Sequence, residues 1–261
     1  MIGLGSNRLS VCRRGGMSVT QAGRGGMEWL AGHREPIWSS PYSAQATAAL
    51  KDAFTAAQWE IINAYGRTTP YLDAINAFAP EDPYIMYSLI PELGYNRQIL
   101  FDGNTWFDTG VAFSACTEVY AEVYLLRTNM ATFGNRASSW AGLLQWTSTL
   151  YVNNISAGSY SEGWADVVVT PTWMTYNGNK RTYNTTFNSS NLLLGIVNSA
   201  TNSKNTFRTF GYKENGIDHL WIPCYKGTGN NRIKGMLDLT MASFKENQGT
   251  GDPTISETPA S

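Results

Sequence analysis

The sequence is poor in cysteine, in net charge and in long apolar runs, and each shortage excludes a class of protein. Its three cysteines, Cys12, Cys116 and Cys224, are widely spaced and form no C-x-x-C pair. This argues against a zinc site and a disulfide framework, and for folding in a reducing cytoplasm. No run of about 18 apolar residues predicts a membrane span, so no membrane partner is expected. The first residues, MIGLGSNRLSVCRRGG, lack the apolar run of roughly 7–15 residues of a signal peptide, so we expect synthesis in the cytoplasm without Sec-type export.

Charged residues make up only 15% of the chain, with 19 basic against 20 acidic side chains. No global field would attract nucleic acid, and no nucleic-acid partner is expected. The hydrophobic content of 43% and the aromatic content of 13% are high, which suits a well-filled all-β core. A length of 261 residues allows one large sandwich with a small extra piece.

Residues 1–43 resemble an extended arm, because they carry the runs RRGG and GRGG and little apolar periodicity. Three interpretations stay open: an arm that docks on a partner, a disordered tail, or an RGG-type RNA contact. The docked arm would supply anchoring and oligomer contacts through Arg13, Arg14, Arg24, Trp29 and Trp38.

Residues 44–94 are predicted to be a small helical anchor or linker. Apolar side chains recur at helical spacing over residues 44–66, between a plausible N-cap at Ser43 and a stop at Gly66. A second short helix is predicted over Tyr71 to Phe78. One helix and a turn cannot bury a core alone, so this segment must pack on the sandwich or on another subunit.

From Tyr95 the apolar pattern changes to period two, and Asp-Gly and Asn-Gly turns separate short runs rich in β-branched and aromatic residues. The predicted fold is therefore mainly β: a jelly-roll β-sandwich over residues 95–245, preceded by the extended arm and the short helical segment. Residues 246–261 are predicted to be a tail that leaves the domain. The predicted strands are Arg97–Phe101, Thr105–Val111, Glu118–Leu126, Ala131–Gly134, Gly142–Trp146, Thr149–Val152, Trp164–Thr170, Thr172–Tyr176, Lys180–Thr185, Leu192–Ile196, Phe207–Tyr212, Ile217–Pro223, Arg232–Leu239 and Ala242–Phe244.

Several sequence pieces resemble, in the same order, those of concanavalin A-like (laminin-G-like) jelly-roll domains. The first resembles the opening "dG..yidTGi" and the last resembles the ending "vgmyD.....f..n.GtG". Each piece is short, but their order extends over roughly residues 95–251. The pieces are ILFDGNTWFDTGV (99–111), ATFGNR (131–136), MTYNGNK (174–180), NLLLGIVN (191–198), FRTFGYKENG (207–216), HLWIPCYK (219–226) and GMLDLTMASFKENQGTG (235–251).

This resemblance implies a two-sheet, many-stranded fold found in proteins of Bacteroides-type gut bacteria and their phages. Some members of the family bind carbohydrate, some bind calcium, and many are structural or adhesive. The expected function is that of a phage virion structural protein: a head fibre, decoration or tail component. Its expected partners are other virion proteins, further copies of itself in a homo-oligomer, and a host-surface glycan, with the virion as its location. The alternative is a carbohydrate-binding module or lectin of a gut bacterium.

Catalytic patterns are weak in this sequence. Glycosidases of this fold use closely spaced carboxylates on one strand, and the nearest pair here is Glu118 and Glu122. Four strand residues separate them by about 13 Å, whereas retaining and inverting pairs need roughly 5 Å and 6.5–9.5 Å. No G-x-S-x-G motif is present, and the two histidines, His33 and His219, lie in no cluster with metal-ligand spacing. We expect a non-enzymatic protein without a cofactor, while a calcium site of loop oxygens stays open because it leaves little sequence trace.

Carbohydrate binding requires exposed aromatic rings beside amide or hydroxyl groups. Trp164 and Trp173 lie within predicted strands and are expected mainly in the core. Tyr160 lies in a Gly- and Ser-containing stretch, residues 156–163, that is predicted to be a loop. The predicted carbohydrate-binding residues are Trp140, Trp146, Tyr151, Asn153 and Tyr160.

Overall fold

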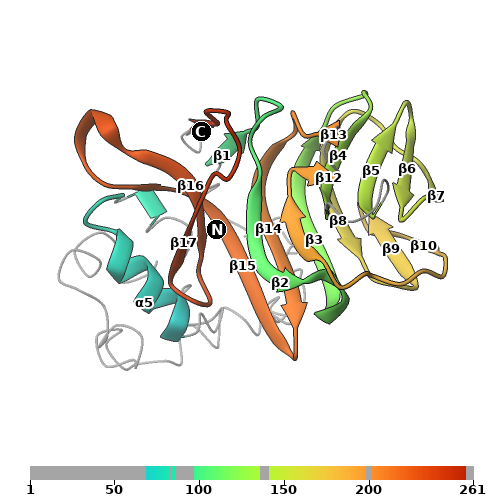
Figure 1. The fold of residues 1–261 in the computed structure, drawn as a ribbon, viewed down its shortest axis with the longest axis horizontal. Coiled ribbons are helices and arrows are strands. Elements are labelled where there is room, and N and C mark those ends of the chain that lie inside the picture. Colours follow the sequence, from blue (N-terminus) through green and yellow to red (C-terminus); the bar gives the residue numbers. More distant parts are fainter. Residues whose placement is uncertain (1–68, 83, 86–96, 136–140, 198–200, 257–261) are drawn as a thin grey trace, which may run out of the picture. The chain divides into compact units, whose positions relative to one another are not determined.

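The structure, a computed structural model, describes residues 69–82, 84–85, 97–135, 141–197 and 201–256 (Figure 1). The chain divides into two compact units, Met1–Tyr95 with Pro259–Ser261, and Asn96–Thr258. The predicted arm, residues 1–43, with Arg13, Arg14, Arg24, Trp29 and Trp38, lies outside the described residues, as does the predicted helix over residues 44–66.

The described part of the first unit contains helix α5 (Thr69–Phe78), which confirms the short helix predicted over Tyr71 to Phe78. Pro70 lies in its first turn, where a missing backbone N–H costs no intrahelical hydrogen bond. Ala74 and Ile75 are fully buried. Within the described residues, no helix combines the length and the apolar character that a membrane crossing requires.

The second unit is mainly β and consists of two large antiparallel sheets, which confirms the predicted jelly-roll-like sandwich (Figure 1). The larger sheet has ten strands in the order β10-β9-β8-β3-β14-β15-β16-β17, and β1 pairs with both β14 and β18. Its strands are β1 (Gln98–Leu100), β3 (Cys116–Leu125), β8 (Gly163–Val169), β9 (Trp173–Tyr176), β10 (Asn179–Thr182), β14 (Thr206–Glu214), β15 (Ile217–Lys226), β16 (Ile233–Asp238), β17 (Ser243–Glu246) and β18 (Thr254–Ser256).

The smaller sheet has six strands in the order β2-β11-β4-β5-β6-β7. A separate two-stranded ribbon and two short 3-10 turns, η5 (Phe113–Ala115) and η6 (Gly229–Asn231), complete the described unit. The strands of the six-stranded sheet and the ribbon are β2 (Phe107–Ala112), β4 (Met130–Gly134), β5 (Gly142–Trp146), β6 (Thr149–Val152), β7 (Ile155–Ser159), β11 (Asn191–Leu194), β12 (Ile196–Val197) and β13 (Thr201–Asn202).

The core lies between the two sheets because side chains alternate along each strand. On β3, Val119, Val123 and Leu125 are fully buried in the core, whereas Glu118 and Glu122 point to the other face of the sheet. Phenylalanines from both sheets meet in this layer. Burying one such side chain stabilises the fold by about 1.5–3 kcal/mol, so this layer accounts for much of the driving force for folding.

On each side of the sandwich, a long basic side chain connects the edge strands of the two sheets. Arg181 on β10 donates to Ala157 O (2.8 Å) and Ser159 O (2.7 Å) on the edge strand β7. Lys245 on β17 donates to Thr109 O (3.4 Å) on the opposite edge strand, β2. A Cβ at Gly158 would lie only 2.9 Å from the Arg181 guanidinium, so glycine keeps this approach open. Both cations occupy edge carbonyls that could otherwise pair with another chain.

Several short strands differ from the sequence predictions. The predicted strand Leu192–Ile196 divides into β11 and β12, which belong to different sheets, and β13 was not predicted. β7 (Ile155–Ser159) occupies part of the stretch predicted as a loop, and most of its residues are not buried, which explains its weak apolar pattern. β18 (Thr254–Ser256) pairs with β1, so residues 246–256 do not form a tail that leaves the domain. The Asn-Gly turn between β9 and β10 is as predicted, with positive φ at Asn177 (48°) and Gly178 (80°).

Candidate functional site

The outer face of the six-stranded sheet brings together two of the predicted carbohydrate-binding residues. On β5, Leu143 points into the core, so Leu144 and Trp146 point outward. On β6, Leu150 and Val152 point inward and Tyr151 points outward, where it packs on Ala131 and Leu144. The alternation of a two-stranded hairpin therefore places Trp146 and Tyr151 on one surface.

The strand register sets the spacing of this aromatic pair. Leu144 lies opposite Tyr151, and Trp146 lies opposite Thr149. Trp146 and Tyr151 are therefore diagonal neighbours, about 7–8 Å apart at the backbone and within reach of each other's rings. Trp146 is 44% exposed, the most exposed tryptophan of the described residues.

Hydroxyl side chains border the pair on its β7 side. The register places Ser159 opposite Thr149, and Ser156 opposite Tyr151. A surface with two aromatic rings beside several hydroxyl groups offers apolar area for stacking and donors and acceptors for orientation. This combination matches the mixed apolar and hydroxylated faces of a sugar ring. We call Trp146, Tyr151, Thr149, Ser156 and Ser159 the aromatic face.

Asn153 was predicted to bind sugar, but its side chain holds the fold together. It lies in the β6–β7 turn with a φ of 46°. Its Oδ1 accepts from Gly142 N (2.7 Å), and its Nδ2 donates to Thr186 O (2.7 Å) and Thr185 Oγ1 (3.1 Å). Both ends of the amide are engaged in structural contacts, so Asn153 positions the hairpin, and its contact with a sugar stays a prediction.

Tyr160 was predicted as an exposed loop residue, and this is wrong. It is only 6% exposed and belongs to the core. Its hydroxyl lies 2.9 Å from Leu126 O and 3.2 Å from Thr147 O. Burial raises the pKa of this hydroxyl. A ring in this position cannot stack on a ligand, and Trp140, the remaining predicted residue, lies outside the described residues.

The outer face of the ten-stranded sheet carries two further tryptophans, which were expected in the core. Trp164 lies opposite Tyr124 in the register, and the two rings make an edge contact with 5.7 Å between centroids. The Arg208 guanidinium lies 3.8 Å from the centre of the Trp164 ring, and the Lys180 ammonium lies 4.7 Å from that of Trp173. A cation therefore covers one face of each ring.

The carboxylates of the predicted pair also lie on this outer face, and each is bound to a cation. Glu118 pairs with Lys213 (3.3 Å), and Glu122 pairs with Arg208 (2.8 Å). Glu122 has a nearer acidic neighbour, because the register places Asp166 of β8 directly opposite it. Cross-strand neighbours of this kind lie about 5 Å apart, and spacing along one strand could not reveal them. Glu122 therefore belongs to a cluster with one guanidinium, that of Arg208, and one further carboxylate, that of Asp166.

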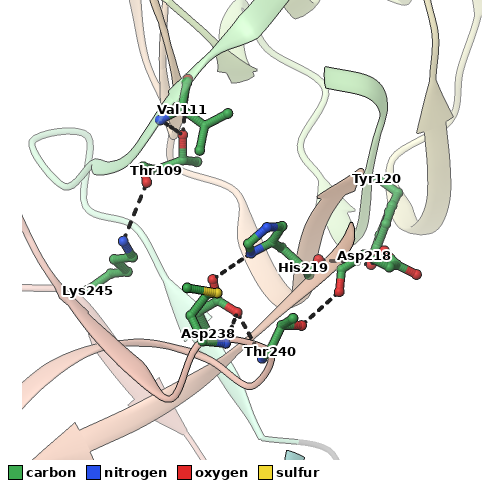
Figure 2. A network of polar contacts seen from close by, with 9 residues as sticks. Thr109, Val111, Tyr120, Asp218, His219, Asp238, Thr240 and Lys245 are labelled. Carbon is green, nitrogen blue, oxygen red and sulfur yellow. Dashed lines mark hydrogen bonds and ion pairs between the residues drawn. The ribbon is translucent and has the colours of Figure 1, made fainter. Parts of the chain in front are cut away.

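His219 belongs to a buried polar network with Asp238 (Figure 2). Its Nδ1 lies 3.0 Å from Asp238 Oδ2, and its ring stacks on Tyr212 with 4.5 Å between centroids. The other oxygen of Asp238 accepts from the backbone N–H groups of Thr240 (2.9 Å) and Met241 (3.2 Å). The network therefore fastens the β16–β17 turn to β15, and it is structural.

Groups near His219 are poor reactants because they are buried. Burial raises the pKa of the Tyr212 hydroxyl, and the negative charge of Asp238 raises it further. Burial, with a contribution from Glu214, raises the pKa of Cys116 to about 12, so this thiol stays protonated at neutral pH. Within the described part of the chain, no group of three or more His, Cys, Asp or Glu side chains is placed to hold a metal ion.

Comparison with known proteins gives no relative from which a function could be carried over. No protein-family model matches this chain, and a search of the curated proteins returns no similar sequence. The aromatic face is therefore the feature of the described residues that best supports a binding function.

Proposed function

We propose that this protein is a non-enzymatic structural protein of a phage virion, which displays a lectin-like sandwich and contacts host-surface glycan through the aromatic face. The observation that carries the glycan contact is the position of Trp146, 44% exposed, on the same surface as Tyr151. Exposed aromatic side chains beside hydroxyl groups are what a weak, stacking-based sugar contact requires.

The arrangement of strands supports display. The chain enters the sandwich at β1 and its last described strand is β18, and these two strands pair with each other. The first and the last described strand of the unit are therefore next to each other. In Figure 1, β5, β6 and β7 lie at the end of the sandwich away from β1, the strand with which β18 pairs. A module mounted through its chain ends would thus hold the aromatic face away from its attachment.

The glycan contact is tested with the full chain on a glycan array and by titration calorimetry. We expect binding that is lost in a Trp146→Ala, Tyr151→Ala double variant and kept in Trp173→Ala. Trp173 is the matched control, since it is an outer-face tryptophan of the other sheet with Lys180 over its ring. Equal binding by the double variant and the wild type would remove the aromatic face from the proposal.

The virion role is tested separately. Antibody labelling and electron microscopy of phage particles should place the protein on the head or the tail, and light scattering of the purified chain should give a homo-oligomer. A protein absent from particles that still binds glycan would favour the alternative, a carbohydrate-binding module or lectin of a gut bacterium.

A further inference from the structure

The C-terminal segment Asn247–Ser256 lies along the start of the sandwich. Its strand β18 pairs with β1, with Gln98 opposite Ser256 and Leu100 opposite Thr254. Ile255 is 8% exposed and belongs to the core cluster. β1 is thus held between β14 and β18, the last strand of the described residues.

Asn247 joins this segment to the turn between β1 and β2. Its Oδ1 accepts from Trp106 N (3.0 Å) and Gly249 N (2.8 Å), and its Nδ2 donates to Gly251 O (2.7 Å). The backbone adds two further bonds, Gln248 N to Trp106 O (2.9 Å) and Gly251 N to Asn104 O (3.2 Å). The segment is therefore held largely through the main chain, as a bound extended peptide is.

Asp102 completes the contact from the other side. Its carboxylate accepts from Asn104 N (2.8 Å), Thr105 Oγ1 (3.0 Å) and Asp252 N (2.9 Å). Desolvation raises the pKa of Asp102, but these hydrogen bonds together outweigh it and lower the pKa. The group is therefore charged at neutral pH, as an acceptor of three hydrogen bonds should be.

Two glycines of the segment fit where no side chain would. A Cβ at Gly249 would overlap the carbonyl oxygen of Asn104, and a Cβ at Gly251 would overlap the carboxylate of Asp102. Thr250 lies between them and is exposed. The contact thus selects for Gly-x-Gly, because a backbone carbonyl lies close to the first glycine and a carboxylate lies close to the second.

We propose that residues 247–256 are a strap that the sandwich binds as a peptide, in a seat formed by β1 and residues 102–106. The seat recognises the sequence Asn-x-Gly-x-Gly of residues 247–251. The strap pairs residues that are 158 positions apart (256 − 98). Contacts so distant in sequence form late in folding. Strand β1 is therefore secured only after residues 247–256 have been made, so the finished sandwich requires this segment.

The test compares Gly249→Ala with Thr250→Ala in the full chain by hydrogen exchange. We expect exchange at residues 98–101 to be at least tenfold faster in Gly249→Ala than in the wild type, because the strap is displaced and β1 loses a neighbour. Thr250→Ala, the matched control, should leave exchange unchanged. Wild-type protection of β1 in Gly249→Ala would overturn the proposal.

Adding the segment as a separate peptide tests whether the sandwich binds it as a ligand or only gains stability from its covalent connection. A chain ending at Glu246 is mixed with a labelled peptide of residues 247–258, and binding is followed by fluorescence anisotropy. We expect saturable binding that weakens at least tenfold when the peptide carries Gly251→Ala and stays constant with Thr250→Ala. A folded truncated chain that ignores the peptide would contradict the proposal, and a truncated chain that folds only after peptide addition would support it.

Discussion

The outer faces of the two sheets both carry tryptophan, but the rings have different surroundings. On the ten-stranded sheet, Arg208 lies over Trp164 and Lys180 lies over Trp173. On the six-stranded sheet, Trp146 is 44% exposed and its register neighbours are uncharged. On the first face a cation covers one side of each ring, whereas on the second face Trp146 has 44% of its surface exposed to solvent.

The difference shows that tryptophan content alone does not identify a binding surface. Arg208 also forms an ion pair with Glu122 (2.8 Å), so Trp164, Arg208 and Glu122 form one connected cluster. Such a cluster stabilises the sheet on which it lies. A ring with a large exposed fraction is expected to contribute less to folding stability and more to binding.

The largest expected difference comes from the same substitution made on each face. Trp164→Ala removes a half-buried indole together with its contacts to Arg208 and Tyr124, and we expect a loss of about 2 kcal/mol in the free energy of unfolding. Trp146→Ala should change that free energy by no more than about 0.7 kcal/mol, since its ring is largely exposed. Urea denaturation of both variants measures the two values.

The control for this pair is Trp164→Phe, which keeps an aromatic ring under Arg208 and should recover about half of the loss. The comparison between the faces fails if Trp146→Ala is as destabilising as Trp164→Ala. That result would assign Trp146 to the structure of the six-stranded sheet and not to a binding surface.

Most strands of the sandwich can be predicted from the sequence because the signals that specify a strand are local. Period-two alternation and Asn-Gly turns depend on neighbouring residues, and they predict strands such as Gly142–Trp146 and Thr149–Val152 with their observed bounds. The strap does not follow in this way. Its strand is only three residues long. Hydrogen bonds with Asp102 and Trp106, which are far away in the sequence, hold it on the sandwich.

The candidate site was only partly predictable for the same reason. Trp146 and Tyr151 share a face because they lie on one hairpin, which alternation can reveal. Tyr160 is buried in the core, where its hydroxyl donates to the carbonyl of Leu126, a residue distant in the sequence. The cation over Trp164 also comes from a strand that is remote in sequence. Tertiary partners, and not residue type, decide which aromatic rings stay exposed.

A smaller effect is expected from removing the cation alone. Arg208→Ala leaves Glu122 without its ion-pair partner and uncovers the Trp164 ring, and we expect a loss of about 1–1.5 kcal/mol in the free energy of unfolding. Acrylamide quenching of tryptophan fluorescence should increase in the same variant. A double-mutant cycle with Glu122→Gln should give a coupling energy of about 0.5 kcal/mol. A coupling energy of zero would mean that the Arg208–Glu122 ion pair adds no stability and that only the contact between Arg208 and the Trp164 ring does.

The smallest expected effect is that of salt. It should weaken the ion pairs on the outer face of the ten-stranded sheet and leave the uncharged aromatic face unchanged. Raising ionic strength to about 1 M shortens the screening length to roughly 3 Å, which weakens partly exposed ion pairs such as Glu122–Arg208 and Glu118–Lys213. We expect the contribution of each ion pair to the free energy of unfolding to fall by no more than about 0.5 kcal/mol. The measurement compares the salt dependence of urea unfolding in the wild type with that in Arg208→Ala. Glycan binding should be unchanged over the same range, because the aromatic face consists of uncharged side chains. Binding that weakens strongly with salt would move the ligand contact from Trp146 to the charged outer face of the ten-stranded sheet.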